Sequence, residues 1–192
     1  MSSEQTPSQT VGPYFAYCLT PEQYGYNYNS LAGPQMADQK IQGERIRITG
    51  QVLDGDGAPV SDAMIEVWQA DANGRYSDPS QQDEFTGFGR VGTGTDPHNR
   101  FWFDTIKPGA TPDGQAPHLN VMVFMRGLLS HVYTRIYFSD EGALNDRDPV
   151  LGSVEETRRP TLMASREETP GGTVYRFDIH MQGASETVFF DV

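Results

Sequence analysis

The sequence predicts a mainly β protein: a single-domain β-sandwich with an irregular, aromatic N-terminal arm. Short apolar runs, rich in β-branched and aromatic residues, alternate with turn signals along the chain, which is typical of a sandwich. The one stretch with modest helical promise, residues 154–168, is interrupted by Pro160. A chain of 192 residues is long enough for one sizeable core, so we expect one domain.

Residues 1–44 form the predicted arm. It is rich in aromatic side chains, namely Tyr14, Phe15, Tyr17, Tyr24, Tyr26 and Tyr28. This content is high for a disordered tail, although a free tail is the alternative interpretation. We therefore expect an ordered arm that forms an interface with a partner and belongs to the same domain as the core at 45–192.

The first part of the core is expected to hold strands at 45–52, 64–70, 100–106 and 116–124. In the first of these, alternation places Ile46 and Ile48 toward the interior. The turn signals D-G-D-G at 54–57 and D-A-N-G at 71–74 separate the runs. The run A-P-H-L-N-V-M-V-F at 116–124 reads as a buried strand, because it is apolar and partly β-branched.

Further strands are expected at 132–138, 175–181 and 186–192. The run V-Y-T-R-I-Y-F at 132–138 alternates sharply, so Tyr133, Arg135 and Tyr137 share one face. An arginine between two tyrosines has two interpretations. It is either a cation stacked on aromatic rings at the surface, or a cation that meets an anionic ligand.

Composition excludes several classes of function. Lys and Arg number 14 against 26 Asp and Glu, a formal net charge of -12, which argues against binding to nucleic acid or anionic lipid. Cys18 is the single cysteine, so an intrachain disulfide is impossible and a cytoplasmic location is expected. Neither a signal peptide nor a membrane-spanning run is visible.

His118 and Asn120 are the first candidates for chemistry. Period-2 alternation points both side chains the same way, yet an amide is a poor ligand for iron or zinc. A lone strand histidine is more often a hydrogen-bonded structural group than a ligand. Tyr76 could bind ferric ion as a phenolate, but it would need companions. No histidine pair with chelating spacing and no cysteine or carboxylate cluster is visible, while a Ser-His-Asp arrangement stays open.

Four segments together resemble the intradiol ring-cleavage dioxygenases: E-V-W-Q-A-D-A-N-G-R-Y, T-I-K-P-G, A-P-H-L-N and T-R-I-Y-F. The terminal runs T-P-S-Q-T-V-G-P-Y-F and Y-R-F-D-I-H-M-Q-G extend the resemblance over nearly the whole chain. It implies a β-sandwich core, in agreement with the strand pattern. It also implies a non-haem ferric ion held by two tyrosinates and two histidines in the catalytic members.

Carried over residue by residue, this ligand set is broken. Tyr76 matches the first tyrosine and His118 the first histidine, but Thr111 stands for the second tyrosine and Asn120 for the second histidine. Gln115 stands for an arginine that helps the reacting substrate. The resemblance therefore implies that this chain alone has no catalytic residues and binds no metal.

The resemblance is strongest to the α chains of the family's two-chain enzymes. It implies a β-chain partner that holds the Fe(III), assembly of several αβ units, and cleavage of protocatechuate by O₂ to 3-carboxy-cis,cis-muconate. The residues that match substrate-binding positions are Thr10, Gly12, Pro13, Tyr14 and Arg135. Two alternatives stay open: a self-sufficient dioxygenase with a divergent metal site, and a non-catalytic β-sandwich binding or carrier module.

Overall fold

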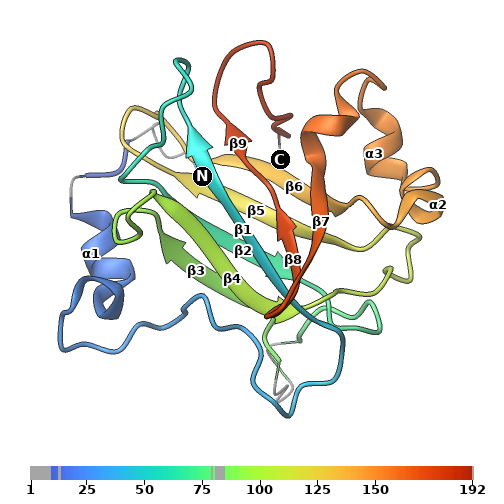
Figure 1. The fold of residues 1–192 in the computed structure, drawn as a ribbon, viewed down its shortest axis with the longest axis horizontal. Coiled ribbons are helices and arrows are strands. Elements are labelled where there is room, and N and C mark those ends of the chain that lie inside the picture. Colours follow the sequence, from blue (N-terminus) through green and yellow to red (C-terminus); the bar gives the residue numbers. More distant parts are fainter. Residues whose placement is uncertain (1–9, 13, 79, 81–84, 192) are drawn as a thin grey trace, which may run out of the picture.

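Nine strands form two facing β-layers in the computed structural model, which describes residues 10–12, 14–78, 80 and 85–191 (Figure 1). The strands are β1 (Arg45–Leu53), β2 (Met64–Gln69), β3 (Phe88–Gly92), β4 (Arg100–Ile106), β5 (His118–Phe124), β6 (Val132–Phe138), β7 (Met163–Thr169), β8 (Gly172–Arg176) and β9 (Ile179–His180). Their order is β3-β2-β5-β6-β7-β8-β1-β4, and β9 pairs with β1. The mainly β fold class is thus confirmed.

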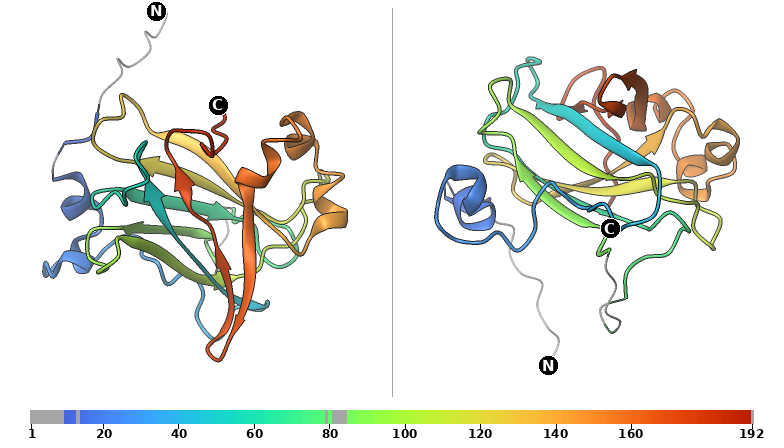
Figure 2. Two further views of the ribbon diagram at one scale, coloured as in Figure 1. Left: turned by 45° about the horizontal axis from the view of Figure 1, so that its top comes forward. Right: turned by 60° about the horizontal axis from the view of Figure 1, so that its bottom comes forward.

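The layers enclose one main apolar core. β1 crosses over β2 and β5 in Figure 1, and Figure 2 shows the same arrangement from two other directions. Side chains of both layers form one buried cluster, which includes Ile48 of β1, Val67 of β2, Phe103 of β4 and Val121 of β5. The predicted inward direction of Ile46 and Ile48 is confirmed, since they are 4% and 0% exposed.

Antiparallel pairing of β2, β5 and β6 sets the geometry of the candidate site. Asn120 of β5 lies opposite Trp68 of β2 on one side and opposite Arg135 of β6 on the other. His118 lies opposite Tyr137. Residues that face each other in neighbouring antiparallel strands are close enough for their side chains to interact. This register therefore gathers side chains from three strands on the outer face of the sheet.

The predicted strands at 100–106 and 132–138 match β4 and β6 in both bounds. The predicted strand at 175–181 is interrupted between β8 and β9, where Phe177 N donates to the Thr49 carbonyl at 2.9 Å. The Phe177 carbonyl there lies 1.7 Å from where a Cβ on Gly50 would stand, so glycine permits this close approach.

Another predicted strand was wrong. Residues 186–191 form no strand, and Phe190 makes only an isolated bridge to Tyr133. The stretch 154–168, whose modest helical tendency Pro160 was expected to interrupt, contains the short 3-10 turn η2 (Arg159–Leu162) and most of strand β7. Short helices α2 (Gly142–Asn145) and α3 (Pro149–Ser153) precede it, and strand β3 was not predicted.

The arm is ordered in its described part. It contains α1 (Phe15–Leu19) and the 3-10 turn η1 (Pro21–Tyr24), and it then runs along β4, where Met36 N donates to the Asp104 carbonyl at 2.9 Å. The Gln23 side chain bonds both the N–H and the carbonyl of Gly92, at 2.8 and 2.6 Å. Among the described residues, no helix has the length and apolarity that crossing a membrane requires.

Candidate functional site

Three of the side chains at predicted ligand positions converge. Tyr76 follows the turn after β2, and its hydroxyl lies 3.0 Å from His118 Nε2 and 2.8 Å from Asn120 Nδ2. The predicted shared direction of His118 and Asn120 is therefore confirmed. The Tyr76 ring also lies against Trp68, with 4.5 Å between ring centroids.

These side chains form a directed hydrogen-bond relay that begins at Tyr133. The Tyr133 hydroxyl donates to Asn120 Oδ1 at 2.6 Å, and Asn120 Nδ2 donates to the Tyr76 oxygen. His118 Nδ1 lies 2.7 Å from the Ala116 carbonyl, which can only accept, so Nδ1 carries the proton and Nε2 accepts from Tyr76. Each donor thus meets an acceptor, and an amide at position 120 supplies one of each.

Burial keeps the relay neutral at physiological pH. It raises the pKa of Tyr76, an effect that outweighs the hydrogen bond from Asn120 and the nearby charge of Arg135. Burial likewise lowers the pKa of His118. It also raises the pKa of Tyr133, with Arg135 acting in the opposite direction. A neutral imidazole, two neutral phenols and an amide therefore satisfy one another without a cation.

The neutral His118 should make folding stability depend on pH. Because its pKa is lower in the folded chain than its unfolded value of about 6.5, its stabilising contribution is present above that pH and is lost as the pH falls. Wild type should therefore lose more unfolding free energy between about pH 7 and about pH 5.5 than His118→Gln does. Urea unfolding at each pH measures this, with His131→Gln at an exposed position as control. An identical pH slope in wild type and His118→Gln would contradict it.

Thr111 does not join the relay. Its hydroxyl donates to Oδ1 of Asp113, and Asp113 Oδ2 accepts from Gln115 Nε2 at 2.5 Å. These two hydrogen bonds lower the pKa of the exposed Asp113. The predicted ligand position thus belongs to a polar loop before β5.

Arg135 lies beside this loop. Its Nη1 donates to Gln115 Oε1 at 2.7 Å and to the Tyr137 hydroxyl at 3.3 Å. The side chain is half-buried, yet among the described residues it makes no ion pair. Its hydrogen bonds are to neutral groups, whereas buried charges in proteins are usually paired.

Tyr137 and Asp148 extend the hydrogen bonds of Arg135 toward the buried side. The Tyr137 hydroxyl donates to Asp148 Oδ1 at 3.2 Å, while Asp148 Oδ2 accepts from Ala116 N at 2.7 Å. Asp148 is also the N-cap of α3, where it accepts from the N–H groups of Val150 and Leu151. Asp113 and Asp148 were not predicted from the sequence. The signal available for Asp148 was an N-cap pattern, Asp followed by Pro.

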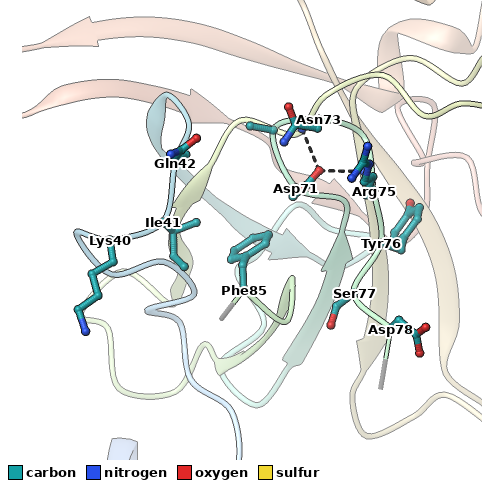
Figure 3. Close-up of a pocket in the computed structure, with 11 residues that line it drawn as sticks. Lys40, Ile41, Gln42, Asp71, Asn73, Arg75, Tyr76, Ser77, Asp78 and Phe85 are labelled. Atoms are coloured by element: carbon teal, nitrogen blue, oxygen red, sulfur yellow. Dashed lines mark hydrogen bonds between the residues drawn. The ribbon is translucent and has the colours of Figure 1, made fainter. Parts of the chain in front are cut away.

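A cavity of about 510 Å³ is lined in part by Tyr76 (Figure 3). Its walls are the arm at Lys40–Gln42, the turn at Asp71–Asp78 and Phe85. In Figure 3 the Lys40 side chain points away from Phe85, and the marked bonds of Asp71 stay within its own turn. Of the relay residues, the lining includes Tyr76, so this groove lies beside the relay.

The predicted N-terminal site residues lie elsewhere. Thr10, Gly12 and Tyr14 are exposed and precede or adjoin α1, and Pro13 is outside the described residues. α1 stands at one end of the molecule and α3 at the other in Figures 1 and 2. The hydrogen bonds of Arg135 lead through Tyr137 to Asp148, the N-cap of α3. The fold therefore does not bring Arg135 and the N-terminal site residues together within one chain.

The donor set does not fit a ferric ion. A hydroxyl at Thr111 and an amide at Asn120 stand where the resemblance places a tyrosinate and an imidazole, and both are weak ligands for iron. The remaining pair, Tyr76 and His118, bond each other. No group of three His, Cys, Asp or Glu side chains that could hold a metal ion occurs within the described ranges.

Comparison with known proteins agrees with this architecture. A family model described as "Dioxygenase" matches residues 12–183. The chain is 55% identical over 195 residues to the protocatechuate 3,4-dioxygenase alpha chain of Burkholderia cepacia, with 98% of both chains covered. The chain therefore belongs to the family of intradiol ring-cleavage dioxygenases, and the resemblance seen in the sequence is confirmed.

Two further likenesses concern the same family. The beta chain of protocatechuate 3,4-dioxygenase from Burkholderia cepacia is 37% identical over 161 residues, covering 76% of this chain and 67% of its own length. The dioxygenase domain of a carbohydrate-binding fusion protein from Streptomyces sp. SirexAA-E superposes with a TM-score of 0.65 at 24% identity, covering 94% of this chain and 100% of that one. At this level of identity, the superposition on the Streptomyces domain shows similarity of fold alone.

Proposed function

We propose that this chain is the alpha subunit of a protocatechuate 3,4-dioxygenase, and that it lends residues to a substrate cavity whose iron is held by a beta subunit. The complex cleaves the ring of protocatechuate between its two hydroxyl-bearing carbons with O₂, giving 3-carboxy-cis,cis-muconate. The similarity to an alpha chain along 98% of the sequence supports this assignment. The lone cysteine, Cys18, is exposed and supports a cytoplasmic location.

The neutral relay is the main observation in support of iron binding by the beta subunit and not by this chain. Binding a ferric ion would require Tyr76 to lose its proton and His118 Nε2 to release the hydrogen bond it accepts. The burial that raises the pKa of Tyr76 opposes that proton loss. With no imidazole at position 120 and no phenol at position 111, nothing compensates for it. Iron therefore resides in the beta chain, itself a relative of this one.

Arg135 supplies a positive charge to the substrate cavity that this chain shares with the beta subunit. It is half-buried, its hydrogen bonds are to neutral groups, and it lies opposite Asn120 in the sheet. A half-buried guanidinium that is bonded to neutral groups can bind an anion, and protocatechuate carries a carboxylate. We expect the arm to bring the exposed residues Thr10, Gly12 and Tyr14 to the beta chain's cavity; Pro13, predicted to act with them, lies outside the described residues.

Iron analysis and visible absorbance test this proposal, on the chain alone and on the chain produced together with the beta subunit. We expect the lone chain to be colourless and iron-free. The complex should be active, coloured by tyrosinate-to-iron charge transfer, and hold one iron per αβ pair. Near-stoichiometric iron in the lone chain, or two irons per pair, would contradict it.

The alternatives predict different results. A self-sufficient dioxygenase would cleave protocatechuate without a partner, although the described residues contain no carboxylate, cysteine and histidine cluster for its metal. A carrier module would bind protocatechuate tightly when isolated and would add nothing to turnover by the beta subunit. Titration of protocatechuate against the chain with and without its partner separates these cases.

A further inference from the structure

Gln115 lies between the guanidinium of Arg135 and the carboxylate of Asp113. Its amide oxygen accepts from Arg135 Nη1 at 2.7 Å, and its amide nitrogen donates to Asp113 Oδ2 at 2.5 Å. The two ends of an amide are not interchangeable: the oxygen accepts and the nitrogen donates. The carboxylate of Asp113 therefore fixes which end of Gln115 faces Arg135.

The same nitrogen of Arg135 is held on its other side by Tyr137. That hydroxyl donates its own proton to Asp148, so its oxygen is free to accept from the guanidinium. Two neutral acceptors therefore hold Nη1, and each is fixed by a carboxylate that does not itself touch the arginine. The guanidinium also interacts with Tyr133 on the same face of the strand, and among the described residues it forms no ion pair with a carboxylate, so it can pair with an anionic ligand.

From this geometry we infer that Gln115 is a positioning residue that gives the complex its preference for a catechol bearing a carboxylate. The inference rests on the proposed function. Gln115 orients Arg135 through one hydrogen bond and, being neutral, forms no ion pair with it. The full positive charge of the guanidinium is thereby available to the substrate's carboxylate. A glutamate at the same place would form an ion pair with Arg135 and remove that charge from the cavity.

The test compares variants of the assembled complex on two catechols. Protocatechuate carries the carboxylate, and catechol, used as a slow substrate or as a competitive inhibitor, lacks it. Gln115→Met should raise KM for protocatechuate roughly tenfold, as expected for loss of a hydrogen bond to a charged group. Gln115→Glu should raise it further. For both variants the change in KM or inhibition constant for catechol should stay within about twofold, since that ligand makes no use of the charge.

Controls separate positioning from folding. Gln51→Met removes a glutamine whose side chain donates to the His98 carbonyl at 2.6 Å, far along the chain from Arg135, and should leave both ligands unaffected. Asp113→Asn keeps Gln115 but weakens its anchor, and should change KM in the same direction by a smaller factor. Iron content and melting temperature of each complex verify assembly.

Three outcomes overturn the inference. Equal losses for both catechols in an intact complex would make Gln115 merely structural. Unchanged kinetics in Gln115→Met and Gln115→Glu would remove its role while leaving the proposed function standing, provided that Arg135→Ala still lowers activity. If the wild-type complex itself fails to cleave protocatechuate, the proposed function fails, and this inference fails with it.

Discussion

Arg135→Ala in the assembled complex is expected to lower kcat/KM for protocatechuate about 100-fold, while the iron content stays unchanged. The change removes a half-buried guanidinium that bonds the neutral groups Gln115 and Tyr137 and forms no ion pair within the described part of the chain. Losing one partner of a desolvated charge pair typically costs a few kcal/mol, which is the origin of this factor. Steady-state kinetics and iron analysis of the same preparation measure both quantities.

A matched control is Arg126→Ala. Arg126 follows β5, is exposed, and forms an ion pair with Asp62 at the surface, so its loss should change kcat/KM by less than about twofold. Arg135→Lys keeps the charge but not the planar donors, so we expect partial activity. If Arg135→Ala left the kinetics intact in an assembled complex, Arg135 would be a surface cation held against its neighbouring tyrosines.

Much of the fold could be predicted because alternation is a local property. The strand at 132–138 has an apolar residue or threonine at every second position, and Thr134, Ile136 and Phe138 are all buried. One layer of the sandwich buries that face, so the period-2 pattern persists in the sequence. Strand β4 was found for the same reason.

The errors occurred where tertiary contacts outweigh local preference. Strand β7 reads A-S-R-E-E in its middle, charged residues that suit a helix, and it is mostly exposed because it pairs at the junction of the two layers. Strand β3 is short and begins and ends beside glycines, so its pattern is too brief to detect. The run after Glu186 is apolar enough for a strand, but in its described part it forms one isolated bridge, between Phe190 and Tyr133, in place of a ladder.

The candidate site could be predicted in part. Tyr76, His118 and Asn120 were singled out by their match to ligand positions, and the structure brings them together. The support for Arg135 could not be predicted, because Asp113 and Asp148 are 22 and 13 positions away from it, on either side, in loops whose approach depends on the whole sheet. No spacing rule connects residues in separate loops, so such partners emerge only from the fold.

Asp148→Ala is expected to lower the free energy of unfolding by about 3–5 kcal/mol. Asp148 is 1% exposed and accepts from Ala116 N, Tyr137, Val150 N and Leu151 N. The substitution removes the cap of α3 and leaves the donors at the start of β5 and at Tyr137 without an acceptor. Unpaired buried donors carry a large desolvation penalty, so the loss exceeds that of a cap alone. Urea unfolding followed by circular dichroism measures it.

Asp146→Ala is the matched control, because Asp146 lies two positions earlier, is exposed, and caps nothing with its side chain in the hydrogen bonds described. Its effect should stay within about 0.5 kcal/mol. Asp148→Asn keeps one acceptor oxygen for α3 but presents an N–H toward a donor. Its loss of unfolding free energy should therefore lie between those of Asp146→Ala and Asp148→Ala. A loss near that of Asp146→Ala would mean that Ala116 N and Tyr137 find water instead. Arg135 would then lack its buried anchor, and its orientation would depend on Gln115 alone.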